Sequence, residues 1–171
     1  MTPPILETER LRLRPLCEAD FPVFAEFYES DRSRYVGGPV SAEQSWRILA
    51  SEIGHWTLRG YGRWGVEEKS TGAFCGVIGL WNPHAWPEPE LGWDLMAGFE
   101  GKGYATEAAL AARAYAYDVL KWPTAISLVV LENVGSASVA KRLGATRESR
   151  FTHDRFGEMD IYRHPSPEAL K

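Results

Sequence analysis

A glycine-bearing stretch in the middle of the chain has the composition of a phosphate-binding turn. Residues 99 to 108 read Phe-Glu-Gly-Lys-Gly-Tyr-Ala-Thr-Glu-Ala. Glycines carry no Cβ, so the backbone N–H groups of such a turn can approach a ligand closely, and the positive end of a following helix points to the same place. A diphosphate fits this arrangement. An ordinary strand-to-helix turn without a ligand fits the same spacing equally well.

Two common nucleotide-binding motifs do not account for this stretch. A Walker loop places Lys and then Ser or Thr directly after its second glycine, but Gly103 is followed by Tyr104 and Ala105. A dinucleotide-binding fingerprint requires Gly or Ala at the position of Thr106 and an acidic residue about 20 positions further on. Residues 121 to 125 offer no acidic side chain. The sequence therefore predicts neither motif.

Four helices are expected from apolar residues that repeat every three or four positions. Asp20 is expected to cap the first helix, and Ser41 begins a capping-box pattern for the second, which ends near Gly60. The third helix follows the glycine-bearing turn, is rich in alanine and is expected to be the longest. The fourth covers residues 135 to 143 and ends at Gly144, which suits a left-handed C-terminal cap.

Seven segments have the composition of β-strands, at residues 10–14, 62–68, 73–81, 90–96, 125–131, 146–153 and 158–163. The second and third are joined by a short turn and are expected to form an antiparallel hairpin. The fourth strand, the third helix and the fifth strand follow one another along the chain. This order predicts a right-handed crossover in which the two strands run parallel.

The composition is that of a folded chain that needs no metal or disulfide. Of the 171 residues, 44% are hydrophobic and 25% charged, which excludes a disordered protein. A chain of this length buries about 70% of its unfolded surface. Cys17 and Cys75 complete no zinc site and are expected to be reduced. A net charge of -4 without a basic run argues against a nucleic-acid partner, and no segment approaches the roughly 18 apolar residues of a membrane span.

At this point the sequence resembles the GNAT superfamily of acetyl-CoA-dependent N-acetyltransferases, and most closely its branch of ribosomal-protein alanine acetyltransferases. The motifs that carry the resemblance are residues 99–108, Asn133-Val134-Gly135-Ser136, Lys141-Arg142-Leu143-Gly144-Ala145, residues 6–14 and Tyr162-Arg163-His164-Pro165. They span nearly the whole chain and are specific as a set. The resemblance implies an α/β (α+β) fold in one domain, residues 1–171: a mixed, mostly antiparallel sheet of six to seven strands, flanked by four helices, with a splayed parallel strand pair forming the cofactor cleft.

The resemblance also places the cofactor. In this family the pyrophosphate of coenzyme A sits on the backbone amides of the turn, which here comprises Gly101, Lys102, Gly103, Tyr104, Ala105 and Thr106. The pantetheine arm pairs like an added strand with the segment before it, here Leu95, Met96 and Ala97. Asn133 matches a position near the arm. The cleft is expected between residues 90–96 and 125–131.

Two residues are candidates for the chemistry that the resemblance implies. An amine must lose a proton to attack a thioester, because lysine-like and α-amino groups have pKa values of about 10.4 and 8. Glu90 stands where relatives often carry Glu and is the candidate base or amine anchor, although a strand-end carboxylate is the plainer reading. Ser136 matches the Ser proposed to protonate the departing thiolate, although it could simply cap the fourth helix. A backbone N–H near Leu95 or Met96 would meet the oxyanion.

The sequence departs from the superfamily pattern at two positions. Ala140 stands where many members carry a Tyr general acid, and Glu100 stands where Gln or Arg is common. Glu100 is expected to point to solvent. A thiolate with a reference pKa of about 8.5 can leave without full protonation, so the missing Tyr does not exclude catalysis.

Aromatic and histidine side chains near the expected cleft carry no diagnostic pattern. Three tryptophans, Trp81, Trp86 and Trp93, either wall an acceptor pocket or fill the core. His84 is a lesser candidate for the base. The other histidines, His55, His153 and His164, are expected at the surface or in strands.

The combined reading is a cytoplasmic enzyme that transfers an acetyl group from acetyl-CoA to a primary amine by direct attack in a ternary complex. The acceptor is a protein N-terminus or a small-molecule amine, and no metal, membrane or nucleic acid takes part. Monomer and homodimer both stay open. The main alternative is a non-catalytic acyl-CoA sensor of the same fold, which the absent Tyr and Glu100 favour, and a nucleotide binder that uses the same turn is a more remote one.

Overall fold

The computed structural model describes residues 2–171, and its strands form one sheet in the order β1-β2-β3-β4-β5-β6-β8-β7. The strands are β1 (Leu6–Glu7), β2 (Leu11–Arg14), β3 (Arg63–Glu68), β4 (Phe74–Trp81), β5 (Glu90–Leu95), β6 (Ile126–Val130), β7 (Thr146–His153) and β8 (Gly157–Arg163). All neighbouring strands are antiparallel except β5 and β6, which are parallel. The predicted mixed, mostly antiparallel sheet is confirmed. It has eight strands instead of six or seven, because β1 is too short to leave an alternating pattern in the sequence.

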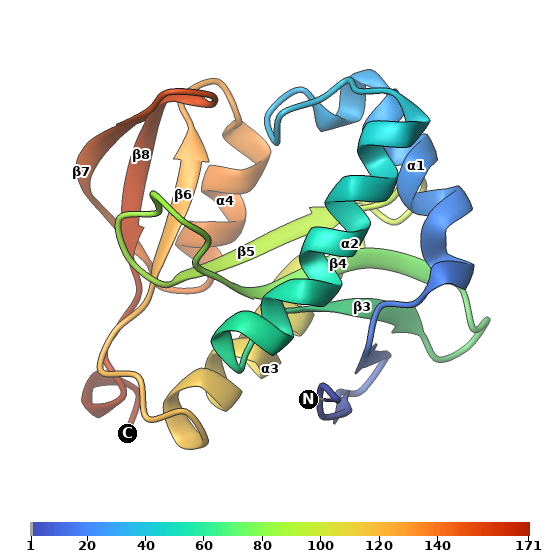
Figure 1. Cartoon of the computed structure of the whole chain (residues 1–171). Coiled ribbons are helices and arrows are strands. Elements are labelled where there is room, and N and C mark those ends of the chain that lie inside the picture. Colours follow the sequence, from blue (N-terminus) through green and yellow to red (C-terminus); the bar gives the residue numbers. More distant parts are fainter. Residues whose placement is uncertain (1) are drawn as a thin grey trace.

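Four α-helices flank the sheet, as predicted. They are α1 (Phe21–Glu29), α2 (Ala42–Arg59), α3 (Tyr104–Asp118) and α4 (Val134–Arg142). Helices α1 and α2 cover one face of the sheet, and α3 crosses the opposite face (Figure 1). The prediction that α3 is the longest helix is wrong, because α2 has 18 residues and α3 has 15. Among residues 2–171, no helix is long and apolar enough to cross a membrane.

The alanine-rich face of α3 brings this helix close to the sheet. Ala108, Ala112 and Ala116 are fully buried in the main core cluster, together with Leu91 of β5. Methyl side chains fill little space, so the helix backbone lies near β5. The start of α3 is therefore held beside the end of β5, where the glycine-bearing turn connects them.

Helix boundaries follow the predicted caps in two cases. The Ser41 hydroxyl accepts from the Gln44 N–H, and the Gln44 side chain accepts from the Ser41 N–H, both at 3.2 Å, so the capping box of α2 is formed. The helix ends at Gly60, which has a φ of 79°. Gly144 after α4 also has a left-handed backbone, with a φ of 81°.

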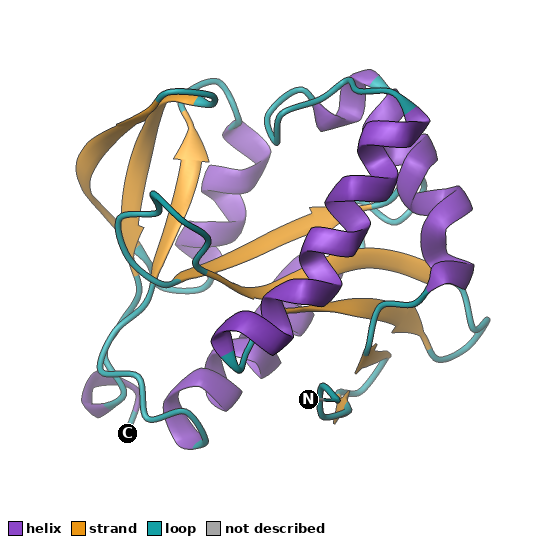
Figure 2. Cartoon of the chain, in the orientation of Figure 1, coloured by secondary structure: helices purple, strands orange, loops and turns teal. Residues whose placement is uncertain are grey.

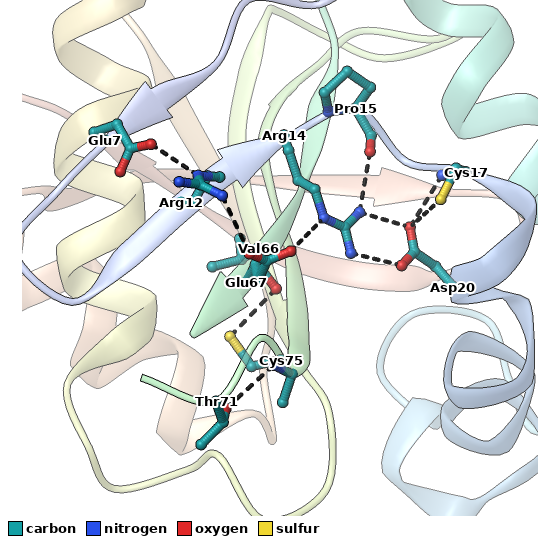
Figure 3. A network of polar contacts seen from close by, with 11 residues as sticks. Glu7, Arg12, Arg14, Pro15, Cys17, Asp20, Val66, Glu67, Thr71 and Cys75 are labelled. Carbon is teal, nitrogen blue, oxygen red and sulfur yellow. Dashed lines mark hydrogen bonds and ion pairs between the residues drawn. The ribbon is translucent and has the colours of Figure 1, made fainter. Parts of the chain in front are cut away.

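Asp20 does not cap α1, which corrects the prediction. Its carboxylate accepts two hydrogen bonds from Arg14, at 2.8 and 2.9 Å, and one from the Cys17 N–H at 3.0 Å (Figure 3). Arg14 also binds Glu67 at 3.0 Å. A carboxylate held by a guanidinium gains more than one that caps a helix, so Asp20 ties the chain before α1 to β2 and β3.

The parallel strands β5 and β6 pair at one position only. Glu90 lies opposite Ile126, and beyond this pair the strands diverge, as Figure 2 shows. β5 continues along β4, whereas β6 continues along β8. The predicted splayed pair is thus present, and it opens a gap in the middle of the sheet.

Candidate active site

A large cavity runs through the gap between β5 and β6. Its volume is about 1420 Å³, and its walls come from α1, α2, β5, β6, the turn before α3, the start of α4 and the β7–β8 hairpin. Pockets for single drug-sized ligands have about 300 to 1,000 Å³. The cavity therefore has room for two substrates at the same time.

The glycine-bearing turn forms one wall of this cavity, and all six of its predicted cofactor residues, Gly101 to Thr106, line it. Gly101 and Gly103 have φ values of 73° and 81°, which other residues rarely adopt. Gly103 precedes the first turn of α3 and offers no side chain to cap it. The buried Thr106 hydroxyl oxygen has no hydrogen-bond partner among residues 2–171. Oxygens of a diphosphate would satisfy both the hydroxyl and the helix N–H groups, so the turn fits coenzyme A.

Contacts from the segment between β1 and β2 hold the turn in place, and local sequence patterns do not predict them. Arg10 donates to the Lys102 carbonyl at 2.8 Å. Glu107, in the first turn of α3, accepts from the Thr8 hydroxyl at 2.7 Å and from Arg10 through three further contacts. Burial opposes the charge on Glu107, but these hydrogen bonds lower its pKa. The partners are 92 to 99 residues apart, so local patterns carried no signal for them.

At the end of β5, the backbone groups that face the gap belong to Leu95. The Met96 N–H donates to the Cys75 carbonyl at 3.0 Å and therefore points toward β4. Because successive residues of a strand direct their backbone groups to opposite sides, the N–H and C=O of Leu95 point into the gap. Of the three residues predicted to pair with the cofactor arm, Leu95 lines the cavity, whereas Met96 and Ala97 lie outside it.

An arginine occupies part of this edge. Arg32 donates to the Leu95 carbonyl at 2.8 Å and forms an ion pair with Glu100. Glu100 also accepts from the Gly98 N–H at 2.9 Å. The Glu100 side chain is 45% exposed, so the expectation that it points to solvent is confirmed, and Arg32 pairs with it at the end of the turn.

Glu90 lies where β5 and β6 begin to diverge, and it lines the cavity. Its carboxylate accepts from the Leu128 N–H at 2.7 Å and from the Trp86 indole N–H at 3.1 Å. It is 7% exposed, and burial raises its pKa to about 7, against the effect of these two hydrogen bonds. A carboxylate with this pKa can accept and release a proton near neutral pH.

Asn133 and Ser136 both line the cavity at the start of α4. The Asn133 side chain accepts from the Ser136 N–H at 3.2 Å, so Asn133 is the cap of α4 and the alternative role of Ser136 as the cap is wrong. The Ser136 hydroxyl accepts from the Trp93 indole N–H at 3.0 Å. No group among residues 2–171 accepts the Ser136 hydroxyl proton, so this proton is free to be donated. Ala140 is fully buried in an apolar cluster beside Trp93.

The remaining candidates divide between the cavity and the core. Trp81, Trp86 and Trp93 line the cavity, whereas His84 is exposed and lies outside it. His55 and His164 were expected at the surface or in strands, but they are 5% and 2% exposed. Both are held by hydrogen bonds to residues distant in the sequence. Within residues 2–171, no three His, Cys, Asp or Glu side chains are arranged to hold a metal ion.

A second polar cluster in the cavity was missed. Arg63 of β3 binds Glu52 of α2 and Asp94 of β5, and all three line the cavity. Burial opposes the charge on Arg63, but the two carboxylates raise its pKa well above its usual value. Each residue belongs to a different element, so spacing along the sequence could not bring them together.

Comparisons with known proteins identify the family to which this cavity belongs. Residues 10–146 match the family model described as the acetyltransferase (GNAT) domain. The chain therefore belongs to the GNAT acetyltransferases.

Individual relatives agree with this assignment. The crystal structure of an acetyltransferase from Agrobacterium tumefaciens C58 is 39% identical, with a TM-score of 0.89 over 97% of this chain and 96% of that one. An uncharacterised N-acetyltransferase of Bacillus subtilis strain 168, YoaA, is 27% identical over 85% of this chain and 84% of its own length. A ribosomal-protein-S5-alanine acetyltransferase from Vibrio fischeri shares the fold at 15% identity, with a TM-score of 0.73 over 98% and 99% of the two chains.

Proposed function

We propose that the protein transfers the acetyl group of acetyl-CoA to a primary amine by direct attack in a ternary complex. The observation that carries this proposal is one continuous cavity that joins a diphosphate-binding turn, an open strand edge and a buried carboxylate with a pKa near neutrality. A sensor would need the first two features but not the third.

Each part of the cavity has a role in this proposal. The turn from Gly101 to Thr106 would hold the diphosphate through backbone N–H groups and the Thr106 hydroxyl. The edge of β5 at Leu95 would hold the arm, with Asn133 on the opposite side of the gap. Arg32 would give up the Leu95 carbonyl as the arm binds. Acetyl-CoA, when bound, supplies a thioester carbonyl, and the Leu95 N–H would stabilise negative charge on its oxygen.

Two side chains would move the protons. Glu90, ionised at and above a pH of about 7, would take one proton from the ammonium form of the acceptor, which frees the nitrogen lone pair for attack. Ser136, whose oxygen is held by Trp93, would donate its proton to the departing thiolate and be reprotonated by the second proton that the nitrogen loses as the amide forms. Cys17 and Cys75 lie outside the cavity, and burial raises the pKa of Cys75 to about 12, so no covalent acyl-enzyme is expected.

The acceptor is an α-amino group of a protein or a small-molecule amine. The likeness to the Vibrio fischeri enzyme, whose name gives the alanine of ribosomal protein S5 as its target, supports the first of these. The volume of the cavity supports either, and its acceptor side is lined by the loop at residues 34–36 and by the hairpin at residues 155–156.

The proposal is tested by measuring acetyl-CoA binding and amine-dependent thiol release separately. Calorimetry should detect acetyl-CoA binding, and a panel of amines and N-terminal peptides should release free coenzyme A. Binding without release for any acceptor would favour the sensor. No binding at all would remove the proposal.

A further inference from the structure

One face of β5 presents two carboxylates with an open space between them. Glu90, Gly92 and Asp94 alternate with Leu91 and Trp93, so they share the face that α1 and α2 cover. A Cβ atom built on Gly92 would lie 3.7 Å from Glu90 Oε1 and 4.0 Å from an Arg63 nitrogen, with no nearer contact than the first. The glycine therefore leaves room for a small group over the strand, directly beside Glu90.

Asp94 has one oxygen fixed and one oxygen free. Arg63 donates to Oδ2 at 2.7 Å, whereas no group among residues 2–171 donates a hydrogen bond to Oδ1. The residue is 8% exposed and lines the cavity. Oδ1 keeps some accessible surface, because Thr106 Oγ1 is the only fully buried side-chain oxygen or nitrogen among residues 2–171 that lacks a partner. From its position on the cavity wall, Oδ1 can therefore accept a hydrogen bond from a ligand that donates.

The charged groups around Asp94 indicate that this ligand carries a positive charge. Arg63 is shared with Glu52, which takes its Nε–H at 3.1 Å and forms a second contact with it. One guanidinium thus faces two buried carboxylates, and Glu90 lies on the other side of Gly92. Four other arginines on the cavity wall are bound to other partners: Arg32 to Glu100, Arg34 to Asp31, Arg47 to Glu43 and Arg155 to the Gly37 carbonyl. Arg142 also lines the cavity, at the exposed end of α4. A cation over Gly92 would balance the excess negative charge.

We propose that Asp94 binds the ammonium group of the acceptor in the space over Gly92, and that the acceptor is an aliphatic amine that arrives in its charged form. This inference rests on the proposed transfer to an amine and adds a specificity-determining residue to it. Arg63 and Glu52 are positioning residues, because they orient the Asp94 carboxylate. Weakly basic aromatic amines, which are neutral in water, gain nothing from Asp94 and are poor acceptors.

The test compares Asp94→Asn and Gly92→Ala with wild type and with the control Asp118→Asn, whose carboxylate lies on the exposed end of α3. The acceptors are tyramine, spermidine, a seryl dipeptide amide and, as the neutral amine, 4-methylaniline. Asp94→Asn should raise the KM of the best aliphatic acceptor at least about tenfold, because a hydrogen bond between charged groups is lost. The dissociation constant of acetyl-CoA should change less than about twofold.

Gly92→Ala keeps the test decisive even where Asp94→Asn, which removes a partner of Arg63, fails to fold. The added methyl group meets only ordinary van der Waals distances, so the melting temperature should not fall, yet it occupies the proposed ammonium position. The KM for the aliphatic acceptor should rise as well. An unchanged KM in both variants, or an equal preference for 4-methylaniline in wild type, overturns the inference while leaving the acetyltransferase function intact.

The failure of the proposed function has a different signature. If wild type binds acetyl-CoA but releases no thiol with any amine, the transferase proposal fails. Calorimetry of tyramine and spermidine with the protein saturated by coenzyme A then decides the role of Asp94. Binding that Asp94→Asn abolishes supports it, and equal binding or no binding overturns it.

Discussion

At the level of single residues, Glu90 carries the clearest chemical expectation. Its pKa of about 7 places the loss of its proton within the range in which the enzyme would work. With saturating substrates, kcat should rise with pH and level off above about 7, because only the ionised carboxylate accepts a proton. In Glu90→Gln, kcat should fall by about a hundredfold or more and this pH-dependent rise should disappear.

A matched control for Glu90 is the exposed Glu158, which lies outside the cavity. Glu158→Gln should keep the wild-type rate and pH profile. If Glu90→Gln retains the rise near pH 7, another group accepts the proton and the assignment of Glu90 as base is wrong. A stopped-flow or continuous thiol assay between pH 5.5 and about 9 covers the range needed.

Ser136 makes a smaller contribution in our proposal. Because Asn133 and not Ser136 caps α4, Ser136→Ala should leave the denaturation midpoint nearly unchanged. Its kcat should fall by about tenfold, less than for a full general acid, because a thiolate leaves without complete protonation. Trp93→Phe removes the indole donor but keeps the hydroxyl, so it should have a weaker effect. A Ser136→Ala variant with wild-type kcat would contradict the role.

At the level of secondary structure, the cap of α4 links stability to the site. Asn133→Ala should lower the free energy of unfolding by about 1 kcal/mol, because the N–H of Ser136 loses its acceptor. Asn133→Ser should restore most of this, since serine also caps well. Urea denaturation of the three proteins measures both differences. Equal losses in Ala and Ser would show that the cap does not stabilise α4.

The elements that the sequence predicted well are those with local signals. The capping box at Ser41 marks the start of α2, and the glycine at position 144 marks the end of α4. The strand-helix-strand order predicts the parallel pair. The caps at Asp20 and Ser136 failed because another group competes in each case: the Arg14 guanidinium holds the Asp20 carboxylate, and the Asn133 carboxamide caps α4 in place of Ser136. A local sequence pattern does not show which of two nearby groups makes the hydrogen bond.

The parts of the site that the sequence could not predict depend on contacts across the fold. The family resemblance predicted Glu90 and the turn. Asp94, Arg63 and Glu52, in contrast, come from three elements and have no common motif. The burial of His164 is of the same kind. It follows from the contact with Ser127 across β6 and β8, which a single apolar run does not specify.

At the level of the whole molecule, the gap in the sheet leaves backbone groups that side chains must satisfy. Where β5 leaves β6, the Leu128 N–H is bound by Glu90, and the Leu91 carbonyl accepts from the Ser127 hydroxyl at 2.6 Å. His164 contacts the same hydroxyl at 2.8 Å. The two halves of the sheet are therefore joined at the gap by one buried acid and one buried histidine network.

These two groups should affect stability with opposite dependence on pH. Glu90 has a folded pKa of about 7 and an ordinary value of 4.5, so folding binds a proton between these values and stability falls as pH rises through them. Burial lowers the pKa of His164 to about 3 from 6.5, with Arg113 and Arg163 adding to the effect. The unfolded chain then binds the proton, so stability falls as pH drops below 6.5. Each slope is about 1.4 kcal/mol per pH unit.

Between pH 4.5 and 6.5 the two slopes cancel in the wild-type protein, and each single variant should reveal the other group. The free energy of unfolding of Glu90→Gln, relative to wild type, should increase with pH across this window. That of His164→Gln, relative to wild type, should decrease with pH. Each difference should change by about 1.4 kcal/mol per pH unit. Chemical denaturation at half-unit intervals measures the differences, in which the other titrating groups cancel. The double variant should return to the wild-type dependence, and parallel curves for all four proteins would show that the gap is not held together by these two ionisable side chains.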